Sequence, residues 1–162
     1  MTSKNILRHR ASILQWGTHA LMLPVIRRFI SPPVFPYTIT ELQQMPGSTL
    51  GHQLAAFITT NHFHLLHGYE THDVKHVLLD YDADEAGEAA MQYFFLGNGE
   101  YSLPVLITVL VTLFIMPEYY GRFIRAFRRG RNTPRLAGTH WSSLLPKNKQ
   151  TILNALRIPP QS

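Results

Sequence analysis

Four side chains near the middle of the chain have the types and the spacing of a metal site. His72 and His76 are four residues apart, so on a helix they lie one turn apart and project from the same side. Asp73 would lie about 100° round the helix from His72, and Glu88 follows His76 after eleven intervening residues. Two imidazoles and two carboxylates are suitable ligands for a divalent transition metal. The sequence therefore predicts a metal site at these four residues.

An ordinary structural role is the alternative for the same residues. A pair of histidines with this spacing arises often by chance, and a histidine that faces inward is commonly a hydrogen-bonded core group. The carboxylates of Asp73 and Glu88 favour the metal, because an inward carboxylate needs a charge partner. Lys75 is the one lysine or arginine between residues 41 and 120.

The residues around the motif predict two helices. From residue 62 to residue 79, histidine and apolar residues recur at alternating spacings of three and four, which is typical of one inward helical stripe. This stripe consists of His62, Leu65, Tyr69, His72, His76 and Leu79. After a turn, Asp82 or Asp84 would cap a second helix that runs from about residue 85 to Gly97. An antiparallel second helix could carry Glu88 back toward His76. His62 is expected to be a core or surface residue, with a supporting role beside the metal as the alternative.

The motif also resembles that of a known family. HDxxH, eleven further residues and then a glutamate is the motif of the coenzyme Q (ubiquinone) biosynthesis protein 4 family, and here it reads His72-Asp73-Val74-Lys75-His76 with Glu88. The segments GSTLGH at 47–52 and HVLL at 76–79 are similar to that family as well, and the resemblance covers about residues 40–130. Asp80 stands where the family usually has glycine, which should alter the turn more than the ligands.

This resemblance implies a metal-dependent step in ubiquinone biosynthesis. The substrate would be a prenylated quinone precursor, and the reaction associated with the family is removal of the ring C1 carboxyl group, a lyase reaction in which the metal is a Lewis acid. Zinc is the expected metal, and two histidines with carboxylates also suit iron or another transition metal. No residue is assigned as a catalytic group. The alternative is a non-catalytic scaffold that binds isoprenoid lipid and holds other quinone-biosynthesis proteins, with a homodimer left open.

The pattern of the whole chain predicts a single all-α domain, a helical bundle over residues 1–162. No run of alternating β-branched residues lies between turn signals. The chain has no cysteine, which excludes disulfides and thiolate metal sites. A Gly-rich phosphate loop is absent too, so nucleotide chemistry has no support. No segment reaches the ~20 apolar residues that a membrane-spanning helix needs.

Charge divides the chain into three parts. Residues 1–40 contain five bases and no acid, residues 41–120 contain ten acids and one base, and residues 121–162 contain nine bases and no acid. Basic ends around an acidic centre predict contact with an anionic membrane surface. We therefore expect a cytoplasmic protein that is peripheral on the inner face of the cell membrane, or on the mitochondrial inner membrane in a eukaryote. Nucleic acid is not expected as a partner, because no binding motif accompanies the arginines.

Three further segments have predicted roles. Residues 1–36 are expected to be a retained basic helix followed by a linker, with a removed targeting peptide as the alternative. Residues 104–116 are the most apolar stretch, so we expect a central core helix, or else one wall of an apolar cavity. In residues 119–131, Tyr119, Phe123 and Phe127 recur every four residues among arginines. That helix would lie on an anionic membrane or pack into the core with a solvated basic face.

Overall fold

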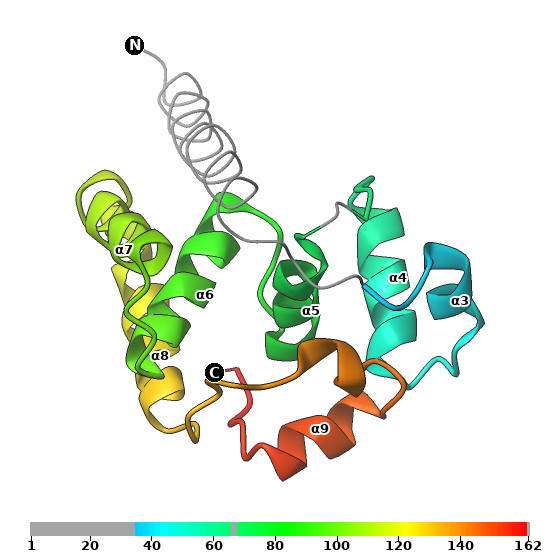
Figure 1. Cartoon of the computed structure of the whole chain (residues 1–162). Coiled ribbons are helices and arrows are strands. Elements are labelled where there is room, and N and C mark those ends of the chain that lie inside the picture. The colour runs from blue at the N-terminus through cyan, green and yellow to red at the C-terminus, as the bar shows by residue number, and fades with distance from the viewer. Residues whose placement is uncertain (1–34, 66–67, 162) are drawn as a thin grey trace.

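The computed structural model of the protein describes residues 35–65 and 68–161 (Figure 1). Over these residues the chain forms seven α-helices and two short 3-10 helices, with no strand. The predicted all-α fold is therefore confirmed. In chain order the elements are α3 (Ile39–Gln44), α4 (Leu50–Thr60), α5 (Glu70–Leu79), α6 (Glu85–Gly97), α7 (Leu103–Ile115), η2 (Pro117–Tyr119), α8 (Tyr120–Arg131), η3 (Trp141–Leu144) and α9 (Lys149–Ala155). The basic helix expected within residues 1–36 lies outside the described residues, apart from the last two positions of its linker.

The helices are arranged as a row of packed neighbours. From one end to the other, α7 and α8 are followed by α6, α5, α4 and α3, and α9 lies beneath α5 and α4 in the view of Figure 1. Their buried side chains form a single hydrophobic cluster that contains residues of every α-helix from α3 to α9.

Local capping sets where four of the helices begin. At the N-caps of α3, α4, α6 and α9, a side-chain oxygen accepts a hydrogen bond from the backbone amide three residues later. In α3 the reciprocal bond of a capping box is also present, from the Thr38 amide to the Glu41 carboxylate at 2.6 Å. In α6 the Asp84 carboxylate accepts from the Gly87 amide at 2.6 Å. Asp84 is thus the cap, and it places Glu88 in the first turn of α6.

Two glycines allow α6 and α8 to pack closely. A Cβ atom on Gly97 would lie 2.1 Å from the Phe127 carbonyl oxygen, and a Cβ atom on Gly130 would lie 2.0 Å from the Phe94 carbonyl oxygen. No side chain fits at either distance, so only glycine permits this approach of the two backbones. Near the other end of the contact, the rings of Tyr93 and Phe123 stack with centroids 4.6 Å apart. Phe123 is buried, so the middle of the aromatic stripe of α8 packs into the core.

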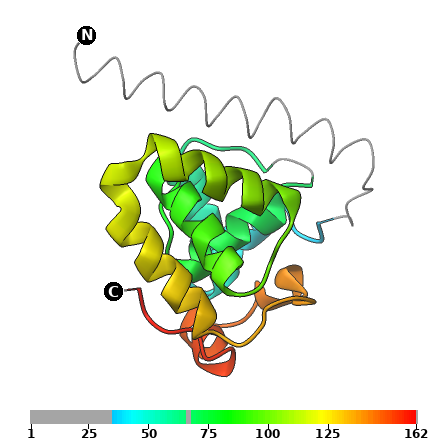
Figure 2. The same ribbon diagram turned by 90° about the vertical axis from the view of Figure 1, so that its left-hand side faces the viewer.

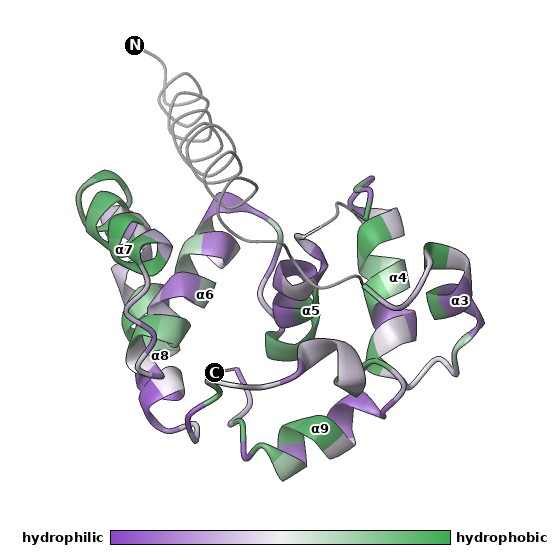
Figure 3. Cartoon of the chain, in the orientation of Figure 1, coloured by the Kyte–Doolittle hydropathy of each residue, from purple (hydrophilic) through white to green (hydrophobic). Residues whose placement is uncertain are grey.

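The apolar helix α7 is at the surface. Only Val105 and Thr112 of its thirteen residues are buried, and the helix forms an apolar edge of the molecule (Figure 3). Its exposed large side chains are Leu103, Leu106, Ile107, Leu110, Leu113 and Phe114. The expectation of a central core helix is wrong. A helix that is apolar all round can be covered on every side only if other elements surround it, and among the described residues α7 packs mainly on α6 and η2.

Helix α7 meets the segment formed by η2 and α8 at a sharp corner (Figure 2). The two directions differ by 104°. Among the described residues no single helix is long and apolar enough to cross a membrane, whereas this bent pair meets the requirement of length and composition when taken together.

The helix that carries the histidine motif begins later than its apolar pattern predicts. It starts at Glu70 instead of near residue 62. Helix α4 ends at Thr60 with Asn61 as its C-cap, and His62 follows with a left-handed φ of 55°. Because that conformation ends a helix and cannot start the next one, His62 is an exposed turn residue, as its surface alternative predicts. At the other end of α5, Asp80 adopts a φ of 61°, which glycine would adopt without strain.

Candidate metal centre

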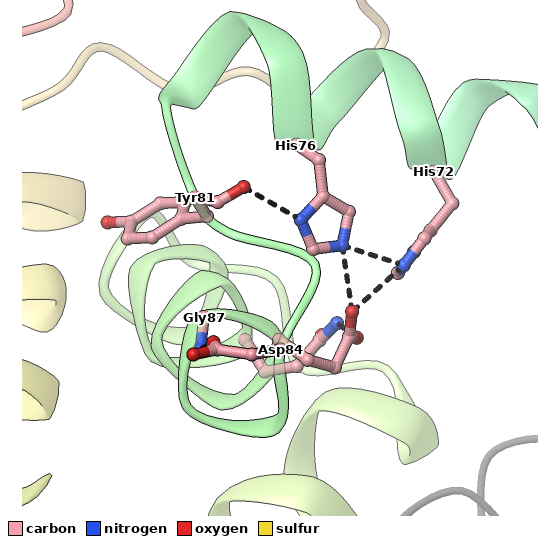
Figure 4. A network of polar contacts seen from close by, with 7 residues as sticks. His72, His76, Tyr81, Asp84 and Gly87 are labelled. Carbon is pink, nitrogen blue, oxygen red and sulfur yellow. Dashed lines mark hydrogen bonds and ion pairs between the residues drawn. The ribbon is translucent and has the colours of Figure 1, made fainter. Parts of the chain in front are cut away.

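One ligand atom from each of His72, His76 and Glu88 lies within 4.8 Å of the other two, and Figure 4 shows the two histidine rings pointing toward the same place. The Nε2 atom of His76 lies 2.8 Å from Oε2 of Glu88, and the Nε2 atom of His72 lies 3.0 Å from the same oxygen. The two Nε2 atoms are 3.1 Å apart. Each of these atoms carries a lone pair when deprotonated, so a proton or a cation must lie between them for the cluster to be stable. Tetrahedral ligands about 2.05 Å from a zinc ion would be about 3.3 Å apart. The three ligand atoms, which are 2.8 to 3.1 Å apart, would therefore move slightly away from one another to coordinate an ion.

The two helices cross instead of running antiparallel. In Figure 4, α5 runs across the view and α6 is seen along its axis. The turn at residues 80–84 and the Asp84 cap place the first turn of α6 against the side of α5 that carries both histidines. Glu88 therefore reaches them from that first turn.

Neighbouring groups hold two of the three side chains in orientation. The Nδ1 atom of His76 donates to the Tyr81 carbonyl oxygen at 3.1 Å, which leaves Nε2 facing Glu88. Metal-binding histidines are usually oriented in the same way, by a hydrogen bond from the nitrogen that does not bind the metal. The Phe57 ring stacks on the His76 ring with centroids 5.8 Å apart. Gln92, one turn beyond Glu88, donates from Nε2 to Oε1 of Glu88 at 2.9 Å, so Oε2 is the oxygen turned to the histidines.

The electrostatics of the cluster are those of a carboxylate facing two imidazoles. Burial acts to raise the pKa of Glu88, but the charge and hydrogen bonds of His72 and His76 outweigh it, and the pKa lies well below its usual value. Burial acts to lower the pKa of His76, but the hydrogen bond and charge of Glu88 raise it overall. The protein environment thus favours a positive charge beside an ionised Glu88, which a bound cation would also supply.

Asp73 stands apart from the three converging groups. Its carboxylate is not among the ligand atoms that lie within 4.8 Å of one another. Burial raises the pKa of Asp73 to about 6, and the charges of His72 and His76 only partly offset this effect. None of the described residues donates a hydrogen bond to its side chain. The structure therefore brings together three of the four predicted ligands, and Asp73 as a ligand stays a prediction.

Sequence reasoning missed three groups near the cluster, two acceptors and one donor. The Tyr81 carbonyl could not be found from sequence, because it depends on the shape of the turn after α5. Glu70, at the start of α5, is buried, and its Oε2 accepts from the Gly68 amide at 2.8 Å. Gln92 could have been found, since it stands four residues after Glu88 on a predicted helix.

An open cavity reaches the cluster from the side of α4. Its volume is about 660 Å³, and its walls include Phe57, His76, Val77 and the aspartates of the turn at 80–84. The buried residue His76 therefore borders a space that admits a small molecule.

The fold has a solved counterpart. The structure is similar to the crystal structure of a protein from Nostoc punctiforme PCC 73102 that is provisionally described as a ubiquinone biosynthesis protein, with a TM-score of 0.62 and 21% sequence identity. The match covers 94% of this chain and 81% of that chain. No protein-family model matches the sequence, and no curated protein matches it significantly. At this identity the likeness shows the fold, which extends over nearly the whole chain.

Proposed function

We propose that this protein is a metal-dependent ubiquinone biosynthesis protein that acts on a prenylated quinone precursor at a membrane surface. The observation that carries the proposal is the convergence of His72, His76 and Glu88, with Nε2 and Oε2 atoms 2.8 to 3.1 Å apart. The HDxxH-x11-E spacing and the fold shared with a protein provisionally described as a ubiquinone biosynthesis protein support the assignment.

In the enzyme, His72, His76 and Glu88 would hold the ion and leave one coordination position open to substrate. Zinc suits the two imidazoles and the carboxylate, and iron would be bound by the same donors. When bound, the metal would supply a Lewis acid beside the carboxyl group of the ring. The Tyr81 carbonyl and Gln92 would keep His76 and Glu88 in their coordinating orientations.

The exposed face of α7 would contact the lipid part of the substrate or the membrane that holds it. Six large apolar side chains are exposed on this helix, with Phe114 at 75% and Leu103 at 69%. The neighbouring helix α8 adds exposed Arg125 and Arg128. An apolar surface beside arginines fits a protein that lies on an anionic bilayer, where each contacting arginine contributes about 1 kcal/mol. This supports a peripheral location on the inner face of the cell membrane or on the mitochondrial inner membrane.

A non-catalytic scaffold is the second candidate, and the position of Asp73 separates it from the enzyme. Three protein ligands leave a coordination position open to substrate, as in catalytic zinc sites, whereas four close a structural site. The three converging side chains favour the enzyme. If Asp73 completes the site, the protein would bind isoprenoid lipid and hold other quinone-biosynthesis proteins.

The decisive experiment measures metal content and product in the same preparation. Metal analysis of the purified protein should give about one divalent ion per chain. A prenylated precursor labelled in its ring carboxyl group should release labelled carbon dioxide with the metal-loaded protein, and not after chelation or with Glu88→Gln. Glu85→Gln is the matched control, because Glu85 lies in the same turn of α6 but outside the cluster. Full metal content without labelled carbon dioxide would support the scaffold instead.

A further inference from the structure

A second cavity lies on another flank of α5, away from the converging histidines. Its volume is about 370 Å³, and its walls come from α5, the end of α6, the loop that follows α6, the loop at residues 135–138, and η3. The side chains that define its chemistry are Lys75, Phe95, Glu100, Tyr101, Arg135 and Trp141. None of these residues belongs to the proposed metal centre.

The walls of this cavity contain two cations that no carboxylate neutralises directly. Among the described residues, no ion pair involves Lys75 or Arg135. Arg135 donates from one terminal nitrogen to the Gly99 carbonyl oxygen at 3.0 Å, and its other donors are free to face a ligand. Glu100 interacts with Lys75 only over a longer distance, and Glu100 accepts a hydrogen bond from Ser102 at 3.2 Å. With two bases against one acid, the cavity has a net charge of +1.

Aromatic rings surround the ammonium group of Lys75. Its nitrogen lies 4.4 Å from the centroid of the Phe95 ring and 5.7 Å from that of the Trp141 ring. These contacts stabilise the charge through the ring faces, but they accept none of its three N–H donors in the way an oxygen does. A side chain that is mostly removed from water therefore keeps unused hydrogen-bonding capacity next to an accessible space.

The cavity is rigid because Asn98 fixes the loop that forms its far wall. The Nδ2 atom of Asn98 donates to the carbonyl oxygens of Thr133 and Pro134, each at 3.0 Å, and its Oδ1 atom accepts from the Leu136 amide at 2.9 Å. Asn98 is buried, so these bonds are shielded from water. The loop that carries Arg135 is thus held in place before any ligand binds, which favours affinity.

We propose that this cavity is a binding site for a small aromatic monocarboxylate. The carboxylate would accept hydrogen bonds from Lys75 and Arg135, and the ring would lie against Trp141 and Phe95. A single negative charge balances the net charge of the walls, whereas a doubly charged phosphate would leave an excess. An apolar cavity of ~150 Å³ holds a benzene molecule, so 370 Å³ accommodates one substituted ring with its carboxylate.

Calorimetric titration of the 162-residue chain with benzoate, benzamide and cyclohexanecarboxylate tests this proposal. Benzoate should bind at least about tenfold more tightly than benzamide, which has the same shape without the charge. It should also bind more tightly than cyclohexanecarboxylate, which has the charge without an aromatic ring. Absence of benzoate binding, or equal binding of benzoate and benzamide, would overturn the proposal.

Substitutions locate the site. Lys75→Met keeps the length of the side chain and removes the charge, and it should weaken benzoate binding at least about tenfold. Arg135→Gln should weaken binding in the same direction, and because Arg135 is exposed this variant tests the site even if Lys75→Met does not fold. Lys147→Met is the matched control, since Lys147 is an exposed lysine outside the cavity. Unchanged benzoate affinity in Arg135→Gln would rule out the site.

Chelation separates this cavity from the metal centre. Because the proposed function places a ring carboxyl group at the metal as well, benzoate affinity for this cavity is measured on the chelated protein and on Glu88→Gln, where it should persist. Loss of benzoate binding on chelation would place the carboxylate at the metal and would contradict the proposal. The metal centre itself is tested by metal content, so failure of one assignment leaves the other measurable.

Discussion

The imidazole of His76 is fixed at both nitrogens, with Nδ1 donating to the Tyr81 carbonyl at 3.1 Å and Nε2 lying 2.8 Å from Oε2 of Glu88. A histidine held in this way has one nitrogen reserved for the backbone and one directed at the cluster. The ring is only 4% exposed, whereas Glu88 is 26% exposed. The candidate metal centre therefore combines a fixed, buried imidazole with a more accessible carboxylate.

Replacing His76 by alanine should release the metal. The variant loses the best-fixed ligand, so metal content should fall from about one ion per chain to less than about 0.1. The chelated variant should also be less stable by about 2 kcal/mol, because Glu88 keeps its charge without its closest partner. Metal analysis and urea unfolding measure the two effects. His140→Ala, at an exposed position, is the control, and full metal content in His76→Ala would rule out this ligand.

Replacing Asp73 by asparagine should weaken metal binding but stabilise the metal-free protein. If Asp73 is a ligand, the substitution should weaken metal affinity at least about tenfold. In the chelated protein it should increase stability, because a half-buried carboxylate with a raised pKa is replaced by a neutral group of the same shape. Competition with a chromophoric chelator gives the affinity. Equal metal affinity in the two proteins would exclude Asp73 from the ligand set.

The stability of the chelated protein should fall between pH 5 and pH 8. The folded-state pKa values of Asp73, at about 6, and of His76 are both raised. A group with a raised pKa stabilises the fold below its unfolded pKa, and this contribution is lost as pH rises through the folded value. For Asp73 alone the change from 3.8 to about 6 amounts to about 1 kcal/mol over this range.

The stability of the metal-loaded protein should instead rise with pH, because protons compete with the metal for His72 and His76 at low pH. Urea unfolding at each pH, with and without chelator, measures both trends. The same pH dependence in both forms would mean that no metal competes with protons at these residues.

Replacing Gly130 by alanine should disrupt the packing of α6 on α8. The added Cβ atom would lie 2.0 Å from the Phe94 carbonyl oxygen, which is backbone and cannot move aside cheaply. We expect a loss of about 3 kcal/mol or more in the free energy of unfolding. Gly47→Ala is the matched control, since its Cβ atom would meet nothing closer than the His52 ring at 4.0 Å. Equal stability of the two variants would show that the helices do not pack this closely.

Charge on the exposed face of α7 should weaken membrane binding. Leu110 is 59% exposed, so Leu110→Glu should reduce co-sedimentation with anionic vesicles and leave stability nearly unchanged. Arg125→Glu combined with Arg128→Glu should also reduce binding, and this loss should shrink as salt screens the charges. Lys147→Glu is the control for the change in net charge. Unchanged co-sedimentation of all these variants would mean that neither α7 nor α8 contacts the membrane.

Local signals in the sequence determined a large part of this structure. The caps at Thr38 and Asp84, and the spacing of His72 and His76, depend only on residues within one or two helical turns. Such features can be predicted because the backbone geometry of a helix fixes which neighbours meet. The all-α fold and the shared side of the two histidines followed from them, whereas the approach of Glu88 depends on how α6 crosses α5.

Only the tertiary structure decided which faces are covered and which groups meet. The apolar pattern of α7 is the same whether other helices surround it or leave it at the surface, and the fold leaves Leu110 and Phe114 exposed. The pattern that begins at residue 62 continues across a break between two helices, because a turn at His62 changes direction without changing the spacing of apolar residues. Asp73 stands apart from His72, His76 and Glu88, and Lys75 lies against Phe95 and Trp141. The neighbours that a helical residue meets depend on how distant segments pack against its helix.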